Sequence, residues 1–402
     1  MRTRATLGLA LTGLLATSVA AVVGAGTAQA SPAPDRGRHA VRVCATPAAS
    51  AVAACQAKVM VSNRTGAVPN SSAPPPGALT PSQLRDAYKL VGTASGGRTV
   101  AVVDAYGYPN LERDLGVYRS RFGLSACTRA NGCLRITDQN GGNSLPRFNA
   151  GWAGETALDV DAVSATCPDC KILVVQARSA NVLDLGQGVR TAAGIAGVVA
   201  ISNSYGAGDL PDSTYGSYFN NPGKAVTAST GDNGYQGGSF PSSSAYVTAV
   251  GGTSLVADSS TSRGWSESAW SGAGSGCSTV NAALAAAAGF DTGCTKRAIA
   301  DVSAAADPGQ GGLAVYYPTS KTTSTWAQVG GTSESSPIIA SVYALSGNTA
   351  GSANAIPYGN AWSLFDVTSG SNGSCPTTQW CTARNGWDGP TGLGTPNGAG
   401  AF

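Results

Sequence analysis

The chain has 402 residues, with 25 Lys+Arg, 22 Asp+Glu and a formal net charge of +3. This charge is too small to indicate a nucleic acid or another polyanion as the partner. A hydrophobic content of 42% allows a sizeable core despite the 54 glycines. The single histidine, His39, lies in a polar stretch near the N-terminus. We therefore expect no histidine in a folded active site, which excludes Ser-His-Asp hydrolases, Cys-His proteases and His-ligated zinc enzymes.

Residues 1–30 predict a secretory signal peptide. Arg2 and Arg4 precede an apolar stretch at 7–23, and the Ala-Gln-Ala sequence at 28–30 is typical of a cleavage site. The alternative is an uncleaved membrane anchor, against which the cleavage site argues. No later segment has ~18 uninterrupted apolar residues. We therefore expect a secreted, extracellular protein that has no membrane contact after cleavage.

The ten cysteines fall into close pairs, a spacing typical of local disulfides in exported proteins. The sequence alone leaves the connectivity open, and pairing between neighbours is the preferred interpretation. One pair has the Cys-x-x-Cys spacing of redox motifs, but a structural disulfide is favoured there because no thioredoxin-like or zinc-site context accompanies it. The expected pairs are Cys44/Cys55, Cys127/Cys133, Cys167/Cys170, Cys277/Cys294 and Cys375/Cys381.

Composition divides the remaining chain into two parts. Residues 31–80 are rich in Ala, Pro and Ser, which predicts a linker or a short pro-segment with one small disulfide loop. A compact domain is expected over 81–402, and Thr80 or Ser82 could cap its first helix, at 79–88.

Short apolar runs alternate with helical stretches in this domain. Continuous apolar strands are buried on both faces, so the pattern predicts an α/β fold with a mostly parallel sheet flanked by helices on both faces. The Gly- and Ser-rich segment at 255–330 predicts loops. The expected strands are 99–104, 171–176, 198–204 and 225–229, and the expected helices are 111–122 and 181–197.

Carboxylates are the acid–base groups left to a chain without a usable histidine. Glu155 and Asp159 stand four residues apart, on one face of a predicted helix. If partly buried, two such carboxyls share a proton and one pKa rises. The alternative is two solvated acids on a helix surface. Asp104, at the end of the first predicted strand, is a further candidate for this network.

A candidate nucleophile follows the glycine pair in the Val-Gly-Gly-Thr-Ser-Glu-Ser-Ser-Pro sequence at 329–337. Glycines allow a tight turn, and Pro337 suits the first turn of a helix. Ser333 is then near a helix N-terminus, which favours a developing anion. The alternative is an ordinary capping serine. The same five residues recur at 250–254 without a proline or a helix, so we expect Ser254 to end a strand.

A third candidate is Asp232, in the Ser-Thr-Gly-Asp sequence at 229–232. It follows a predicted strand, and open α/β sheets build their sites at the carboxyl ends of strands. Asp232 is interpreted either as a turn residue or as a functional acid.

The carboxylate pair, the turn acid and the serine motif occur in the same order as in the sedolisin family of serine-carboxyl peptidases, which the chain resembles. Downstream, Asp-Val-Thr-Ser-Gly at 366–370 and Gly-Trp-Asp-Gly-Pro-Thr-Gly-Leu-Gly-Thr-Pro at 386–396 resemble the family's calcium loop. The resemblance extends from about residue 80 to the C-terminus. It implies a subtilisin-like fold and a peptidase domain over 81–402 with a C-terminal calcium loop.

The resemblance also implies a role for each candidate. Ser333 is the nucleophile and Glu155 is the general base. Asp159 orients and tunes Glu155, and a protonated Asp232 stabilises the oxyanion. A carboxylate base has an unperturbed pKa near ~4, and a carboxylic acid donates to an oxyanion only while protonated. Both requirements place activity at acidic pH.

One structural Ca²⁺ ion is implied as well. Hard oxygen donors suit calcium rather than a transition metal. The family usually has glycine where Arg384 stands, and the alternative is a Gly-rich surface loop closed by a disulfide. The implied ligands are the carboxylates of Asp366 and Asp388 and the carbonyl groups of Val367, Arg384 and Gly386.

The sequence therefore predicts a monomeric acid serine-carboxyl endopeptidase or tripeptidyl-peptidase that cleaves peptides or unfolded proteins. Residues 31–80 are too short for the large prodomain common in the family, so a catalytically silent, secreted binding protein on the same fold is the main alternative. Tyr205 stands where many relatives carry tryptophan beside the substrate cleft. Further alternatives are a two-carboxylate glycoside hydrolase and a Ser-Lys amidase with Lys171 or Lys224 as base.

Overall fold

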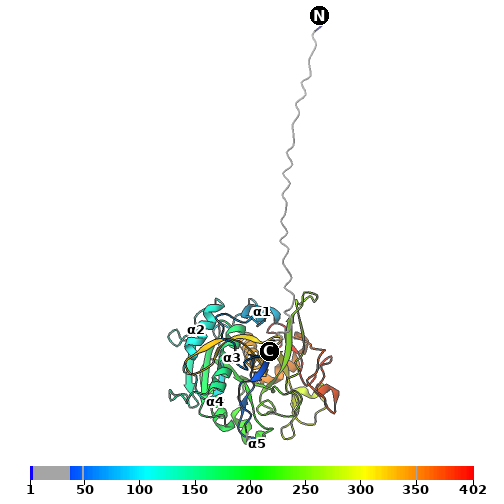
Figure 1. Cartoon of the computed structure of the whole chain (residues 1–402). Coiled ribbons are helices and arrows are strands. Elements are labelled where there is room, and N and C mark those ends of the chain that lie inside the picture. The colour runs from blue at the N-terminus through cyan, green and yellow to red at the C-terminus, as the bar shows by residue number, and fades with distance from the viewer. Residues whose placement is uncertain (3–36, 48, 350) are drawn as a thin grey trace. The chain divides into compact units, whose positions relative to one another are not determined.

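The computed structural model describes residues 1–2, 37–47, 49–349 and 351–402. Nearly all of the expected signal peptide and the first residues of the expected linker lie outside this part of the chain, so the signal peptide stays a prediction. The described residues from 37 to the C-terminus form one compact unit (Figure 1). Within the described residues, no helix has the length and apolar character needed to cross a membrane.

A central eight-stranded sheet carries the fold, and its strand pairs are parallel except for the antiparallel pair at one edge. In spatial order it consists of β11 (Trp265–Ala269), β10 (Thr248–Ala257), β9 (Ala225–Ser229), β7 (Val198–Asn203), β4 (Thr99–Ala105), β6 (Lys171–Ala177) and β5 (Leu134–Asp138), with β14 (Val302–Ala305) also pairing with β10.

Helices flank this sheet, and the first of them begins with a capping box at Thr80, one of the two caps expected. The described α-helices are α1 (Pro81–Ala87), α2 (Leu111–Arg121), α3 (Ala150–Thr166), α4 (Val182–Gly194), α5 (Asp212–Tyr215), α6 (Thr332–Ser346) and α7 (Ile356–Gly359).

Alternate side chains of β4 enter two different cores. Val100 and Val102 pack in a cluster with residues of α3 and α6. Ala101 and Val103 pack in a second cluster, with residues of α4. Successive side chains of a strand point to opposite faces, so the apolar run is explained by helices on both faces. The predicted mostly parallel, doubly covered sheet is confirmed.

A second sheet contains residues that composition had assigned to a linker. It consists, in spatial order, of β1 (Arg38–Arg42), β3 (Lys58–Ser62), β16 (Ser324–Gly330) and β15 (Leu313–Pro318). The first strands of the chain, blue in Figure 1, lie among the elements of the compact unit. Residues 38–62 are thus part of this unit rather than a free linker, because their strands pair with the strand that leads into α6. The other interpretation, a pro-segment, stays a prediction.

The prediction of loops for 255–330 is also wrong. Several strands of both sheets come from this segment, and so does the short ladder of β12 (Gly276–Cys277) with β13 (Ala298–Ile299). Strands such as β11 and β14 lack a long apolar run, and they are strands because they pair with neighbouring strands of the sheet. The remaining ladders pair β2 (Ala54–Cys55) with β8 (Tyr205–Gly206), and β17 (Leu364–Phe365) with β18 (Thr395–Pro396).

The described cysteines all form disulfides, and each joins its neighbour in the sequence, as expected. The Cys-x-x-Cys pair is closed in the same way. The bonds are Cys44–Cys55, Cys127–Cys133, Cys167–Cys170, Cys277–Cys294 and Cys375–Cys381.

Candidate active site

The candidate residues gather at the carboxyl ends of the inner strands of the central sheet. β4, β7 and β9 are parallel neighbours, so their carboxyl ends meet there. Asp104 lies at the end of β4, Ser204 follows β7, and Asp232 follows β9. Two helices on one face supply Glu155 and Ser333, from α3 and α6. The lone histidine, His39, is exposed and bonds through Nδ1 to Asn63 Oδ1 at 2.7 Å, outside this group.

The turn before Ser333 depends on glycine. Gly331 has a φ of 107°, and a Cβ atom there would collide with the carbonyl oxygen of Gln56. The turn starts α6 at Thr332, so Ser333 lies in the first turn of the helix, as predicted. Its backbone N–H donates to the Gln56 carbonyl at 3.2 Å. This N–H therefore already binds a carbonyl oxygen at a helix N-terminus, the arrangement that stabilises an oxyanion.

Pro337 lies inside α6 rather than in its first turn, because the helix begins earlier than expected. Proline has no N–H, so it leaves the carbonyl four residues back, that of Ser333, without its helical partner. The Ser204 hydroxyl lies 3.2 Å from this carbonyl oxygen. The proline thus leaves the Ser333 carbonyl free to bond to Ser204, at the end of β7.

Glu155 and Asp159 are fully buried, so the alternative of two solvated acids does not apply. Burial raises the pKa of Glu155 well above its ordinary value, and the negative charges of Asp159 and Asp104 add to this effect. The pKa of Asp159 is raised by burial and then by Asp104, against the Ser204 hydroxyl, which lowers it. Burial raises the pKa of Asp104 to about 7. These carboxyls therefore favour shared protons over full ionisation.

The contacts of Ser204 are consistent with a protonated Asp159. Ser204 Oγ lies 2.7 Å from Asp159 Oδ1 and 3.2 Å from the carbonyl oxygen of Ser333. A hydroxyl has one hydrogen to donate. Both contacts are hydrogen bonds together only if the Asp159 carboxyl carries a proton and donates it to Oγ.

Ser333, the candidate nucleophile, and Glu155, the candidate base, are close, but no hydrogen bond joins them. Ser333 Oγ donates to the Ser204 carbonyl at 3.1 Å. Both Glu155 oxygens lack a hydrogen-bond partner among the described residues. The Ser333 hydroxyl is nevertheless close enough to lower the pKa of Glu155. Catalytic hydrogen bonds often tighten only when substrate is bound, and rotation about χ1 of Ser333 would turn its hydroxyl from Ser204 to Glu155.

Asp232 is buried beside the start of α6, whereas a residue of a surface turn would be exposed. Its Oδ1 accepts from the N–H and the hydroxyl of Thr332, at 2.8 and 2.9 Å. Its Oδ2 has no partner within the described part of the chain. Burial raises the pKa of Asp232 to about 6, against the positive charge of Lys58 as the largest opposing influence. Below that pH the carboxyl holds a proton that Oδ2 is free to donate.

Ser254, the repeat of the serine motif, has a different environment. It lies within β10, which continues to Ala257, so the prediction that Ser254 ends a strand is wrong. Its hydroxyl donates to Asp307 at 2.7 Å. No helix follows it, as expected. Ser254 is therefore a matched control for Ser333.

The expected calcium loop brings its two acids together. Asp366 Oδ2 accepts from Gly386 N–H at 2.8 Å, and Asp388 Oδ2 accepts from Arg384 N–H at 3.1 Å. Burial raises the pKa of Asp388 to about 7, and the negative charge of Asp366 contributes. The Arg384 guanidinium bonds instead to the Asp291 carbonyl, at 2.7 Å. The described chain places no group of three or more Asp, Glu, His or Cys side chains for a metal, so backbone carbonyls such as that of Val367 would have to complete the site.

Sequence reasoning missed several neighbours of the site. Ser204 is the last residue of the predicted strand at 198–204, which was a usable signal. Gln56, Lys58 and Arg42 come from the segment assigned to a linker, where composition gave no signal. Lys58 Nζ donates to the Asp232 carbonyl at 2.6 Å, and Arg42 bonds to Asn233.

Comparison with known proteins identifies relatives of one kind. Kumamolisin from Bacillus sp. (strain MN-32) is 28% identical over 364 residues, which cover 80% of this chain and 63% of kumamolisin. Aorsin from Aspergillus oryzae is 43% identical over 76 residues, or 17% of this chain and 12% of aorsin. The chain thus spans less than two thirds of the length of these curated relatives. No family model matches the chain.

Solved structures agree on the fold. Pseudomonas sedolisin, a serine-carboxyl proteinase solved with two molecules of pseudo-iodotyrostatin, superposes with a TM-score of 0.65 at 23% identity, covering 80% of this chain and 95% of that one. Sphericase gives a TM-score of 0.51 at 16% identity, covering 78% and 96%. Together they show that the chain has a subtilisin-like fold and is similar in sequence to kumamolisin over 80% of its length.

Proposed function

We propose that the protein is a secreted, acid-active serine-carboxyl peptidase that hydrolyses peptide bonds through an acyl-enzyme on Ser333. The main support is that a serine at a helix N-terminus lies close to the buried Glu155–Asp159 pair. The name of a further relative, tripeptidyl-peptidase SED1 from Arthroderma otae, 41% identical over 78 residues, supports it. The disulfides support an oxidising, extracellular compartment. The substrates would be peptides or unfolded proteins, cleaved by a monomer.

Each group has a distinct part in this reaction. Glu155 accepts the proton of Ser333 Oγ as the oxygen attacks the substrate carbonyl, and then delivers it to the leaving amine. Asp159, held by Ser204, keeps Glu155 in position and sets its pKa. The Ser333 N–H and the protonated Asp232 stabilise the oxyanion.

The test is hydrolysis of a denatured protein from about pH 2 to about pH 8, beside the nucleophile variant considered in the Discussion. We expect hydrolysis only at acidic pH, because a raised carboxyl pKa keeps Asp232 and one member of the Glu155–Asp159 pair protonated there. Binding of peptides without any hydrolysis would instead favour the catalytically silent alternative.

Asp232 allows a prediction about pH dependence. Asp232→Ala is expected to lower kcat by about 10²–10³, the usual cost of losing one oxyanion donor. Asp232→Asn should be faster than Asp232→Ala. It should also stay active above the pH limit that the Asp232 pKa of about 6 sets for the unsubstituted protein, because an amide donates at every pH. The measurement is kcat against pH for the three proteins. A loss below about tenfold in Asp232→Ala would mean a turn role only.

We also propose that the C-terminal loop binds one structural Ca²⁺ through the carboxylates of Asp366 and Asp388. The fit rests on two adjacent acids whose mutual repulsion a divalent cation would relieve, and on their oxygen donors. The carbonyls of Val367, Arg384 and Gly386 would complete the site.

Removal of calcium should therefore destabilise the protein. We expect a chelator to lower Tm, and excess Ca²⁺ but not Mg²⁺ to restore it, because Mg²⁺ dehydrates reluctantly and needs a stricter geometry. In the double variant Asp366→Asn/Asp388→Asn, Tm should no longer respond to calcium. A Tm that is the same with and without chelator in the unsubstituted protein would contradict the site.

A further inference from the structure

Thr332 lies beside both Ser333 and Asp232. It is fully buried at the first position of α6, directly before Ser333, and has no part in the mechanism described so far. Its hydroxyl and its backbone N–H both contact the Asp232 carboxyl. Buried polar groups are almost always hydrogen-bonded, and the direction of these bonds decides what Thr332 does to its neighbour.

The direction of the hydrogen bonds at the Thr332 hydroxyl is fixed by a backbone group. The Gly231 N–H can only donate, and it donates to Thr332 Oγ1 at 3.0 Å. The hydroxyl has one hydrogen of its own, which it donates to Asp232 Oδ1 at 2.9 Å. Thr332 thus bonds at the same time to the backbone before Asp232 and to its side chain.

Oxygen Oδ1 of Asp232 is fully occupied by these donors. It accepts from the Thr332 hydroxyl and from the Thr332 N–H, which lies 2.8 Å away. A carboxyl oxygen has two lone pairs, so with two bonds accepted Oδ1 has none left for a proton. A proton bound by Asp232 is consequently on Oδ2, which has no partner among the described residues.

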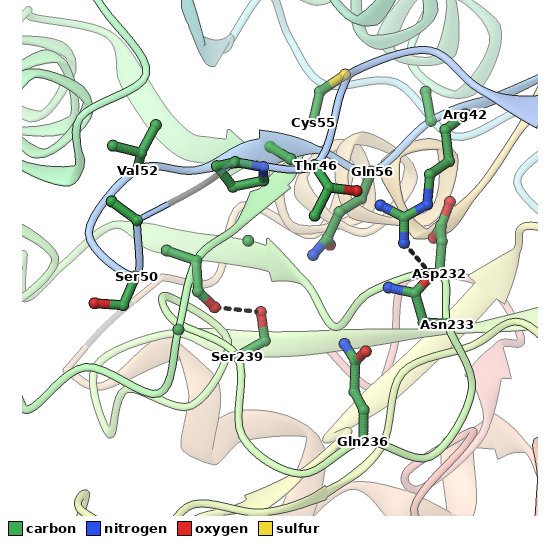
Figure 2. A pocket seen from close by; sticks show the side chains of 17 residues that line it. Arg42, Thr46, Ser50, Val52, Cys55, Gln56, Asp232, Asn233, Gln236 and Ser239 are labelled. Atoms are coloured by element: carbon green, nitrogen blue, oxygen red, sulfur yellow. Dashed lines mark hydrogen bonds between the residues drawn. The ribbon is translucent and has the colours of Figure 1, made fainter.

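Oxygen Oδ2 lies next to the turn that precedes Ser333. A Cβ atom added to Gly331 would lie 2.5 Å from Asp232 Oδ2, so the missing side chain leaves room for this oxygen. Figure 2 shows Asp232 in the wall of a pocket that Asn233 and Gln236, from the same loop, also line. A proton on Oδ2 is therefore on the side of the Ser333 N–H, the other proposed donor to the oxyanion.

The backbone on both sides of this acid is held independently of Thr332. The Gly274 N–H donates to the Gly231 carbonyl at 2.7 Å. On the other side, the Gly234 N–H donates to the Gly272 carbonyl at 2.8 Å. Loss of the Thr332 hydroxyl should therefore change the carboxyl group more than the loop that carries it.

The charges around Asp232 act on its ionisation. Burial is the largest influence and raises the pKa of Asp232 to about 6. The positive charge of Lys58, then the two bonds from Thr332, then the positive charge of Arg42 oppose this rise. On α3, the buried Glu155 has its own pKa raised in part by the charge of Asp232. The Thr332 hydroxyl is thus the uncharged side chain that bonds directly to this carboxyl.

We propose that Thr332 is a positioning residue, which places the proton of Asp232 on Oδ2 so that this oxygen donates to the oxyanion. The proposal rests on the peptidase function proposed above. The Thr332 hydroxyl touches no reacting atom and keeps its own proton throughout. The alternative is a structural role only, in which Asp232 caps α6 because the N-cap residue, Gly331, has no side chain.

The experiment compares Thr332→Val, which removes the hydroxyl but keeps the shape, with Thr332→Ser, which keeps the hydroxyl. We measure kcat and KM for a peptide substrate from acidic to neutral pH. The repeat of the serine motif supplies the matched control. Thr253 is the equivalent threonine there, and its buried hydroxyl likewise donates to a carboxylate, Glu267 Oε1, at 2.7 Å. Thr253→Val therefore removes a similar bond away from Asp232.

In Thr332→Val we expect kcat to fall about tenfold, the effect of one ordinary hydrogen bond, with KM unchanged. The upper pH limit of activity should also move to higher pH, because the ionised form of Asp232 loses a donor. Thr332→Ser should restore both values, and Thr253→Val should change neither. Loss of fold alone would lower kcat without moving the pH limit upward.

A second measurement needs no activity. Carbon-13 NMR of labelled Asp carboxyls follows the titration of Asp232 in Ser333→Ala, and the Asp232→Asn variant identifies its signal. We expect Asp232 to titrate at higher pH when Thr332→Val is added, and at an unchanged pH when Thr253→Val is added instead.

The outcomes separate the two proposals. If Thr332→Val lowers kcat no more than Thr253→Val does, or leaves the pH limit and the Asp232 titration where they were, the positioning role is wrong and the peptidase function stands. If the unsubstituted protein hydrolyses no peptide at any pH, the peptidase function fails, and the role of Thr332 in the reaction fails with it.

Discussion

Ser333→Ala is expected to lower kcat/KM for a peptide substrate by about 10⁴-fold or more. In the proposed mechanism this hydroxyl is the nucleophile, beside Glu155 and the oxyanion donors. Its removal leaves only binding and oxyanion stabilisation. Because Ser333 Oγ makes a single hydrogen bond among the described residues, to the Ser204 carbonyl, the fold should survive. Initial rates at acidic pH and Tm are the two measurements.

Glu155→Gln should cost a similar factor, since an amide cannot take the proton of the serine. The matched control is Ser254→Ala, which removes the hydroxyl from the other copy of the same five-residue motif and should keep full activity. An active Ser333→Ala protein would overturn the nucleophile assignment and revive the two-carboxylate hydrolase. An inactive but folded Ser254→Ala protein would move the assignment to the other serine.

Stability is expected to fall as the pH rises from about 4 to about 7, the opposite of ordinary acid denaturation. Burial raises the pKa of Asp104 from 3.8 to about 7, so the folded protein keeps a proton that the unfolded chain loses in this range. The unfolded state then binds fewer protons, and the free energy of unfolding decreases as the pH rises. For Asp104 alone, about three pKa units correspond to about 4 kcal/mol. Glu155 and Asp159 act in the same direction.

Thermal unfolding of the Ser333→Ala protein, which avoids self-digestion, measures this effect at several pH values and constant Ca²⁺. Tm should be several degrees higher near pH 4.5 than near pH 7.5. Asp104→Asn should raise Tm mainly at the higher pH and so reduce the slope, because its amide never ionises. Asp258→Asn, in a surface turn, is the control and should leave the slope unchanged. A Tm that rises toward pH 7.5 would show that the buried carboxyls are ionised in the folded protein.

The central sheet and the helices that carry Glu155 and Ser333 could be predicted because their sequence patterns are local. The apolar run of β4 has both faces buried, and Glu155 and Asp159 stand one helical turn apart on α3. The scarcity of histidine added a chemical constraint that made carboxylates the natural candidates. These features depend on neighbouring residues, and local sequence is sufficient for them.

The rest depended on contacts between distant parts of the chain. β2 has two residues, Ala54 and Cys55, and it is a strand only because β8 lies beside it. Nothing near Gln56 in the sequence indicates that its carbonyl meets the N–H of Ser333. The role of Ser204 could not be predicted for the same reason, because its hydroxyl contacts α3 and α6 only after both helices pack beside β7. Long-range pairing of this kind leaves no periodic pattern to recognise.

The proline in α6 allows a hydrogen-bonded link between α6 and α3. An ordinary residue at position 337 would tie the carbonyl of Ser333 into the helix's own ladder of hydrogen bonds. With Pro337 in its place, that carbonyl is joined through Ser204 to Asp159 on the neighbouring helix. The position of Ser333 and the protonation of the acid pair are thereby coupled through one hydroxyl. Loss of the Asp159 proton would break one of the two bonds, so the serine loses its alignment in the same step in which the site gains charge.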